Sequence, residues 1–242
     1  MPLRIVWFDR LTIIDLAINR EDIYTGETMS STQPRPRSRK APAERAAEIV
    51  GAATAIARES GLSALTLRAV ADRVGVASGL IAHYQPSMDD LVATVYTDLV
   101  DDEIRDVERI LDTREGPAER LAALLATLMD DAREDLTVVW VEGWAMARRN
   151  AALADAVRTQ MQRWQRLVEG LIADGCRQGR FTTSDPGAVA WQLIGMIDGL
   201  NAQSLARGTD TARFAARTAR AAEVLVGAAP GELAVESIEA HR

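Results

Sequence analysis

Residues 66–91 read TLRAVADRVGVASGLIAHYQPSMDDL and predict two short helices joined by a tight turn, followed at once by a longer helix. Apolar residues recur in the first short helix at the spacing of one helix face: Leu67, Val70, Ala71 and Val74. Gly75 is expected to end that helix, because glycine tolerates the positive φ of a sharp turn. This pattern is typical of a helix-turn-helix, whose second helix lies against DNA.

The second short helix, about residues 77–84, is expected to enter the DNA groove. Its N-terminus presents backbone N–H groups that suit phosphate, and Gly79 lets the helix sit close to the DNA. Thr66 is expected to cap the first short helix, and Arg68 to contact a phosphate or a base. As alternatives, Thr66 is a cap only and Tyr84 is a core residue. The candidate DNA-contacting residues of this segment are Thr66, Arg68, Ala77, Ser78, Gly79, Leu80, His83 and Tyr84.

Charge is distributed unevenly along the chain. The net charge of −7 argues against nucleic-acid binding over the whole surface. Residues 30–45, however, carry five Lys and Arg residues against one Glu. This segment predicts a basic arm on an otherwise acidic protein, suited to local DNA contact through Arg39, Lys40 and Arg45. The alternative is a solvated tail.

Several functional classes are disfavoured by the composition. The single cysteine, Cys176, cannot form a disulfide within the chain, which fits a reducing cytoplasm. The chain lacks the run of about 18 apolar residues that a membrane span requires. It also lacks a Ser–His–Asp set, a metal-binding cluster and a glycine-rich phosphate loop. We therefore expect neither an enzyme nor a protein that carries a metal or cofactor.

Tryptophan is concentrated in the C-terminal half, where four of the five tryptophans lie between residues 140 and 191. Trp140 and Trp144 are four residues apart and share one helix face. Aromatic faces together with the carboxylate of Glu142 or Asp198 favour a quaternary ammonium ion. The alternative is that the tryptophans are core anchors and that Glu142 faces solvent. The candidate ligand-binding residues are Trp140, Glu142, Trp144, Met146, Met161, Trp164, Gln192 and Asp198.

Two helices expected near the C-terminus, about 187–206 and 211–226, carry more apolar surface than one face of a monomer needs. Gly195 and Gly199 are four residues apart, a spacing that lets another helix approach closely. The pair predicts a homodimer in which two copies form a four-helix bundle about a two-fold axis. The alternative is a buried helix pair within one chain. The candidate dimerisation residues are Trp191, Gly195, Gly199, Phe214, Thr218, Ala222 and Leu225.

These patterns predict an all-α fold of about nine helices. Residues 44–91 are expected to form a three-helix domain that contains the helix-turn-helix, and residues 92–227 a bundle for effector binding and dimerisation. Residues 1–43, with the basic arm, and residues 228–242 are expected to be disordered. We further expect translation to begin at Met29, so that residues 1–28 belong to no folded domain.

The segment 44–91 resembles the DNA-binding domain of the TetR family of bacterial transcriptional repressors. The resemblance rests on TLRAVADRVGVASG at 66–79 and HYQPSMDDL at 83–91, where the family usually has a sequence like HYF-x-SK-EEL. Gln85 stands here for the usual Phe and Met88 for the usual Lys, and Met88 removes one expected phosphate contact. VEGWAMARRNAALADAVR at 141–158 and AWQLIGMIDGL at 190–200 are similar to the choline-responsive BetI branch.

Together these features predict a cytoplasmic, dimeric repressor that binds palindromic double-stranded operator DNA and is released by a small-molecule effector such as an organic cation. Effector binding is expected to shift a two-state equilibrium through the helix that begins after Ser87 and links both domains. The alternative is a helical adaptor that binds protein rather than DNA.

Overall fold

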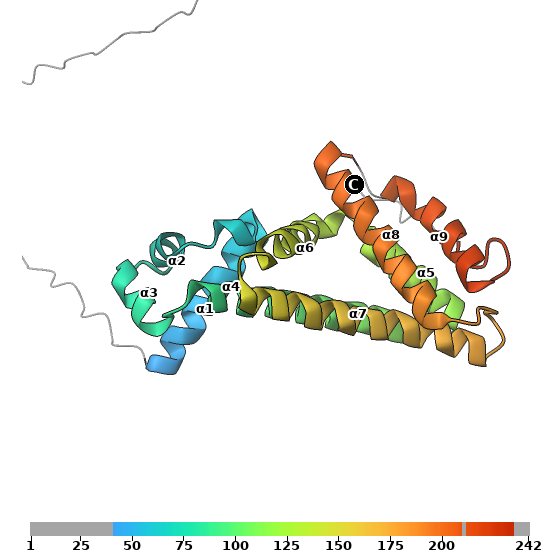
Figure 1. Ribbon diagram of the computed structural model, residues 1–242, viewed down its shortest axis with the longest axis horizontal. Helices are drawn as coiled ribbons and strands as arrows, with labels where there is room; N and C mark the ends of the chain where they lie inside the picture. The colour runs from blue at the N-terminus through green and yellow to red at the C-terminus, as the bar shows by residue number, and fades with distance from the viewer. Residues whose placement is uncertain (1–40, 210–211, 235–242) are drawn as a thin grey trace, which may run out of the picture. The chain divides into compact units, whose positions relative to one another are not determined.

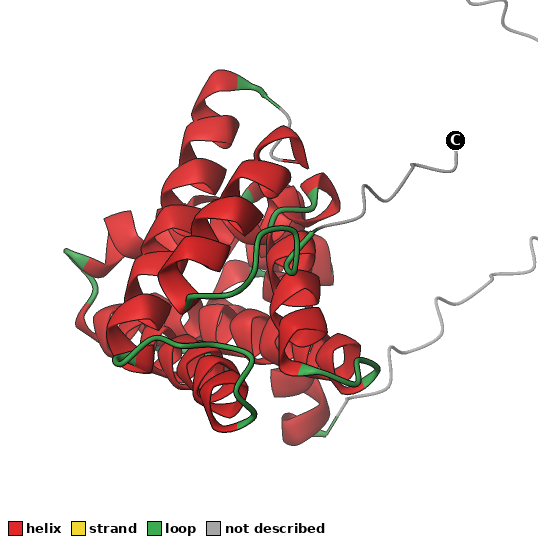
Figure 2. Ribbon diagram, turned by 90° about the vertical axis from the view of Figure 1, so that its right-hand side faces the viewer, coloured by secondary structure: helices red, strands yellow, loops and turns green. Residues whose placement is uncertain are grey.

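The computed structural model describes residues 41–209 and 212–234, and all regular structure in these ranges is helical (Figures 1 and 2). The expected all-α fold is therefore confirmed. The basic residues Arg39 and Lys40, the segment 1–40 and the tail 235–242 lie outside the described residues. The elements are α1 (Pro42–Ser60), η1 (Leu62–Ala64), α2 (Leu67–Val74), α3 (Ser78–Tyr84), α4 (Met88–Asp112), α5 (Pro117–Leu128), η2 (Asp131–Arg133), α6 (Glu134–Ala147), α7 (Ala151–Arg177), α8 (Pro186–Arg207) and α9 (Ala212–Val226).

Helices α1, α2 and α3 pack on one another and form the helix-turn-helix region. Thr66 caps α2, because its side-chain oxygen accepts a hydrogen bond from the Ala69 N–H at 3.1 Å. Gly75 ends α2 with φ of 73°, in the left-handed region that glycine adopts at low cost. Helix α1 begins at Pro42, two residues before the expected start, because proline fits the first turn of a helix.

Helix α4 belongs to both parts of the fold. It packs against α1 and also against α5, α6 and α7. The Ser87 side chain accepts from the Asp90 N–H at 3.1 Å and so fixes where α4 begins. Tyr96 and Leu99 on α4 are fully buried, which anchors this helix in the core. Any movement of α4 therefore affects the helix-turn-helix and the larger bundle together.

The C-terminal pair α8 and α9 lies side by side in Figure 1 and is in contact. Asp185 caps α8 by accepting from the Ala188 N–H at 2.9 Å.

The expectation of disorder from residue 228 onward is wrong for residues 228–234. Leu233 is fully buried, and its N–H donates to the Glu223 carboxylate at 3.0 Å. Burial of one apolar side chain and this hydrogen bond fix the turn after α9.

None of the helices in the described part of the chain has both the length and the apolar character that crossing a membrane requires.

Candidate functional site

The exposed side of α2 and α3 presents the predicted DNA-contacting residues. Ala77 and Gly79 are exposed at the start of α3, and no side chain caps this helix end. A Cβ atom at Gly79 would meet nothing within 4 Å, so the chain's own packing does not require glycine there. The Arg68 side chain is 89% exposed, with only a 3.7 Å ion pair to Asp72. This surface therefore fits close approach by another molecule.

The other candidates on α3 differ in how far their side chains are buried. His83 is exposed and stacks edge-on against Tyr84, with ring centroids 5.2 Å apart. Tyr84, Leu80 and Ser78 are half-buried, and the Tyr84 side chain packs against the core. Tyr84 therefore anchors α3 as well as standing near the predicted DNA face.

Three further residues lie on the helices around α3. Arg45, on α1, pairs with Glu48 at 2.5 Å. Met88, at the usual lysine position, is half-buried against the core. Arg73 was not among the predicted residues; its guanidinium makes two 2.6 Å hydrogen bonds to the Glu59 carboxylate and so links α2 to α1.

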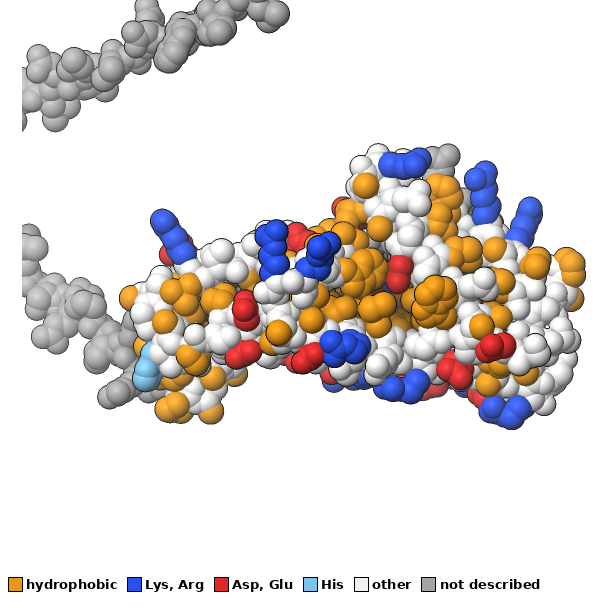
Figure 3. Space-filling model, in the orientation of Figure 1, with side chains coloured by type: hydrophobic (Ala, Val, Ile, Leu, Met, Phe, Trp, Pro, Cys, Tyr) orange, Lys and Arg blue, Asp and Glu red, His pale blue; other side chains and the backbone are white. Residues whose placement is uncertain are grey.

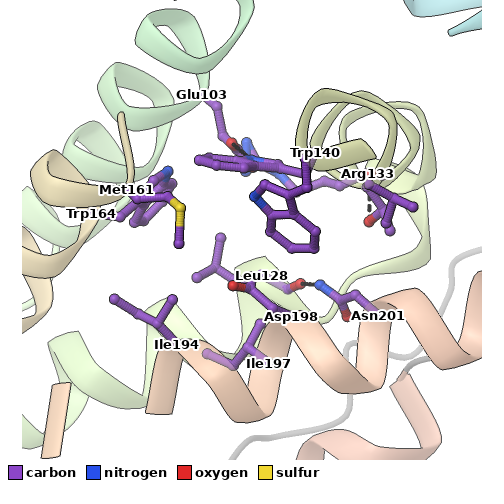
Figure 4. A pocket seen from close by; sticks show the side chains of 13 residues that line it. Glu103, Leu128, Arg133, Trp140, Met161, Trp164, Ile194, Ile197, Asp198 and Asn201 are labelled. Carbon is purple, nitrogen blue, oxygen red and sulfur yellow. Dashed lines mark hydrogen bonds and ion pairs between the residues drawn. The ribbon is translucent and has the colours of Figure 1, made fainter. Parts of the chain in front are cut away.

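A pocket lies among α4, α5, α6, α7 and α8, with an empty volume of about 670 Å³ that includes its opening to solvent. Figure 4 shows Trp140 from α6 and Trp164 from α7 beside it. Trp144, also on α6, lines the pocket as well. Ile194 and Ile197 on α8 close the opposite wall. In Figure 3, hydrophobic side chains gather where α6, α7 and α8 meet, with an acidic side chain among them. The pocket therefore offers large aromatic faces and few polar groups.

The two pocket carboxylates differ in how they are compensated. Glu103 is only 5% exposed, but it accepts a hydrogen bond from Trp140 Nε1–H at 3.0 Å and lies 3.7 Å from the Arg133 guanidinium. Burial raises the pKa of Glu103, and the Trp140 hydrogen bond and Arg133 oppose that shift. Asp198 has no hydrogen bond or ion pair with any described residue. Burial, and next the negative charge of Glu103, raise the pKa of Asp198 to about 7.

Two further polar atoms of the pocket have no partner among the described residues. Trp144 Nε1–H is a buried donor without an acceptor, and Asn201 Oδ1 is a buried acceptor without a donor. The other end of the Asn201 amide donates to the Leu128 carbonyl at 2.9 Å, which fixes its orientation. Because buried polar atoms are normally hydrogen-bonded, a ligand with a small polar group would satisfy them.

A polar hollow adjoins the tryptophan pocket and shares Thr137 and Asn201 with it. The side chains that line this hollow include three acidic ones, Asp130, Asp131 and Glu134. An acidic rim attracts cations and repels anions.

The structure brings only part of the predicted ligand-binding set to the pocket. Trp140, Trp144, Met161, Trp164 and Asp198 line it, whereas Glu142, Met146 and Gln192 do not. Met146 packs half-buried on the core, and Gln192 is exposed on α8.

Glu142 points to the helix-turn-helix region instead of the pocket. Its carboxylate accepts from the Ser63 N–H at 2.8 Å and from the Ser63 hydroxyl at 2.7 Å. The predicted ligand-binding set did not include three residues that line the pocket, Glu103, Arg133 and Asn201. Glu103 stands in a run of charged residues on α4, where the sequence resembles a solvated face.

The outer side of α8 and α9 carries unusually exposed apolar residues. Trp191 is 72% exposed, and Val224, which the sequence analysis did not single out, is 82% exposed. A Cβ atom at Gly195 or Gly199 would meet nothing within 4 Å. These residues leave a face with a large aromatic side chain beside small residues, which a second helix pair can approach closely.

The other predicted dimerisation residues are turned inward. Ala222 is fully buried, and Thr218 is 2% exposed with its hydroxyl donating to the Phe214 carbonyl at 3.0 Å. Phe214 and Leu225 are half-buried. Thr218 and Ala222 thus form the side of α9 that packs on its own chain, because they lie one turn apart on its buried stripe.

Comparison with known proteins agrees with both halves of this description. Residues 49–95 match the model of bacterial regulatory proteins of the tetR family, and residues 117–227 match the C-terminal domain of BetI-type transcriptional repressors. The transcriptional regulator BetI of Burkholderia ambifaria is 31% identical over 163 residues, which cover 64% of this chain and 79% of that protein. The chain belongs to the TetR family. It is a DNA-binding transcriptional regulator with a BetI-type C-terminal domain, and neither an enzyme nor an adaptor without DNA binding.

Two further relatives show how widely this TetR-family fold is used. The transcriptional repressor KstR2 of Mycolicibacterium smegmatis is 27% identical over 147 residues, covering 60% of this chain and 72% of that one. A solved regulator from Saccharomonospora viridis in complex with choline has a TM-score of 0.65 and 23% identity, and the match covers 73% of this chain and 94% of that one. At this identity the likeness establishes the fold alone.

Proposed function

We propose that this TetR-family regulator is a dimeric repressor that leaves its palindromic operator when a small organic cation binds in the tryptophan pocket. The observation that carries this proposal is Asp198, a half-buried carboxylate set among tryptophan side chains and without a hydrogen-bond or ion-pair partner in the described part of the chain. A buried charge of this kind is costly unless a ligand compensates it. Its position beside aromatic faces selects an organic cation over an anion or a neutral molecule.

A quaternary ammonium ion suits this pocket better than a primary amine does. It is weakly hydrated and donates no N–H bonds, so its attraction comes from ring faces and from the nearby negative charge. Each desolvated cation–π contact contributes roughly 0.5–2 kcal/mol. A hydroxyl on the same molecule could accept from Trp144 Nε1–H and donate to Asn201 Oδ1. The choline seen in the Saccharomonospora viridis regulator combines these two groups and supports choline as the first compound to test.

Operator recognition follows from the placement of α3 in a dimer. The exposed face of α8 and α9 would pair two copies, which places two α3 helices at a fixed separation. Half-sites on palindromic DNA are spaced by about 34–36 Å, one helical turn, or its multiples. A ligand that favours a different separation then lowers operator affinity, and the coupling in such systems is typically about 5- to 150-fold. A regulator of this kind works in the cytoplasm, where the operator DNA lies.

Titration with choline and with its uncharged analogue 3,3-dimethylbutan-1-ol tests the cation proposal. Tryptophan fluorescence will report binding, because Trp140, Trp144 and Trp164 line the pocket. We expect choline to bind at least about 10-fold more tightly than the neutral analogue, since only choline compensates Asp198. Equal or tighter binding of the neutral analogue would show that the pocket selects shape and not charge.

The affinity for choline should depend on pH near neutrality. The pKa of Asp198 is raised to about 7 in the free protein, so the carboxyl group is mostly protonated below that pH. Choline keeps its charge throughout, so binding has to displace the Asp198 proton. We expect the dissociation constant to rise about tenfold per pH unit below 7 and to level off above about pH 8. A series of fluorescence titrations from pH 5.5 to 8.5 measures this slope, and a flat profile would contradict it.

Arg68→Ala should weaken operator binding by about 5- to 150-fold if Arg68 reads a base, with the loss concentrated at one base pair. A phosphate contact would instead reduce affinity for all duplexes and lower the salt dependence by about one counterion. Fluorescence anisotropy against duplexes selected from a random pool by the wild type distinguishes these outcomes. Arg166→Ala, an exposed arginine on α7, is the matched control and should leave affinity unchanged. Unchanged affinity in Arg68→Ala would remove this residue from the DNA contacts.

A further inference from the structure

Two faces of helix α6 contact different parts of the protein. One face lines the tryptophan pocket through Trp140, Val141 and Trp144. Another contacts the helix-turn-helix region through Asp135 and Glu142, which are seven residues apart and therefore nearly aligned along the helix. The same rigid element is thus in contact with both the proposed ligand site and the DNA-binding part of the chain.

The contact at Glu142 is built into the backbone of the turn after α1. Both carboxylate oxygens are engaged, Oε2 by the Ser63 N–H and Oε1 by the Ser63 hydroxyl. A Cβ atom at Gly61 would lie 2.5 Å from Glu142 Oε2, so only glycine leaves room for the carboxylate. Gly61 also has φ of 82° and ψ of 169°, a conformation that other residues rarely adopt. The turn therefore forms a specific contact site for the Glu142 carboxylate.

A second link strengthens the same junction. The Arg58 guanidinium, in the last turn of α1, pairs with the Asp135 carboxylate at 3.0 Å. The turn that binds Glu142 is followed directly by α2 of the helix-turn-helix, because Ser63 is three residues before the Thr66 cap of α2. Charge-assisted hydrogen bonds depend strongly on distance and direction, so a small displacement of α6 breaks or redirects them.

We propose that Glu142 is a positioning residue that fixes the helix-turn-helix region to α6, so that occupancy of the tryptophan pocket alters how α3 is presented to DNA. This inference rests on the proposed function of the pocket. The Glu142 contact couples α6 directly to the DNA-binding region, in addition to the coupling through α4 that the sequence predicts. Glu142 itself touches neither ligand nor DNA. Its effect is confined to the coupling between them and to the orientation of α3.

Two variants, Glu142→Ala and Ser63→Ala, remove the carboxylate or the hydroxyl of this contact. In ligand-free protein we expect Glu142→Ala to weaken operator binding about 10-fold, because α3 loses its fixed orientation. Choline affinity without DNA should stay within about twofold of the wild type, since Glu142 does not line the pocket. The ratio of operator dissociation constants with and without saturating choline should fall toward one.

Graded variants separate positioning from a general loss of structure. Glu142→Gln keeps one oxygen that can accept from Ser63, so its coupling ratio should lie between those of the wild type and Glu142→Ala. Glu169→Ala is the matched control, because Glu169 is an exposed acidic residue on α7 that lines neither the pocket nor the adjoining hollow and makes no hydrogen bond to the helix-turn-helix region among the described residues; it should behave as wild type. Ser63 is exposed, so we expect Ser63→Ala to fold, and this variant decides the question if Glu142→Ala fails to fold.

The outcomes for Glu142 and for the pocket are separable. If choline does not affect the wild type, the proposed effector fails, while the ligand-free operator affinities of the Glu142 and Ser63 variants still decide the positioning role. Wild-type operator affinity in both Glu142→Ala and Ser63→Ala would overturn this inference, whatever choline does. A loss of operator affinity in both, with intact choline binding, supports it.

Discussion

Asp198→Asn will bind choline about 10- to 100-fold more weakly than the wild type and will have a higher free energy of unfolding above pH 7. Asparagine keeps the shape of the side chain and removes the negative charge that pairs with the cation. A charged hydrogen bond or ion pair in a partly buried site contributes about 1.5–3 kcal/mol. Isothermal titration at pH 8 measures the loss of affinity directly.

The change in stability has the opposite sign because no residue within 41–209 or 212–234 pairs with the carboxyl group of Asp198 in the free protein. Its pKa is about 7 when folded and about 3.9 in an unfolded chain. The folded state therefore holds an extra proton on Asp198 between these values, so the contribution of Asp198 to stability is most favourable below pH 4 and is lost as pH rises through 7. Asparagine carries no such cost. The difference in pKa corresponds to at most about 4 kcal/mol at pH 8. Because Asp198 is only half-buried and solvent screens its charge, we expect Asp198→Asn to gain about 2 kcal/mol at pH 8 and almost nothing at pH 4.

Denaturant unfolding at both pH values tests this prediction. Asp155→Asn is the control, because Asp155 is an exposed carboxylate on α7 that pairs with Arg158 at 2.8 Å. It should change neither choline affinity nor the pH dependence of stability. If Asp198→Asn binds choline as the wild type does, Asp198 is not the partner of the cation.

The second large effect is expected from Trp191→Glu. Trp191 is 72% exposed on the outer face of α8, and a carboxylate there would have to be buried in the proposed dimer interface. The variant should be a monomer by light scattering at concentrations at which the wild type is a dimer. Because a dimer holds two half-sites at once, operator affinity should fall by about 100-fold or more.

Ala151→Glu is the matched control for added charge. Ala151 is exposed at the first turn of α7, where a negative charge is compatible with the helix dipole. It should remain dimeric and bind the operator normally. A dimeric Trp191→Glu with full operator affinity would place the interface elsewhere.

Local sequence rules were sufficient for the helix-turn-helix region. Thr66, Gly75 and Ser87 mark helix ends through interactions within three or four residues, and the structure confirms each of these ends. Such features depend on neighbouring residues, so a single sequence contains the information that specifies them.

The sequence itself contains a signal against the prediction that Glu142 lines the ligand pocket. Trp140 and Trp144 are four residues apart, and a residue midway between them is rotated by about 200° to the far side of the helix. Helical geometry alone therefore separates Glu142 from the tryptophan face. By contrast, Glu103 reaches Trp140 across 37 residues of chain. That pairing arises from the packing of α4 against α6, which local patterns do not encode.

The most direct test of the account is the operator dissociation constant of the wild-type protein at pH 8 and fixed salt, measured with and without saturating choline. Fluorescence anisotropy with a selected palindromic duplex gives both values. If choline in the tryptophan pocket releases the repressor, the dissociation constant will rise about 10-fold or more. An unchanged constant, at a choline concentration shown by titration to fill the pocket, would contradict the proposed mechanism.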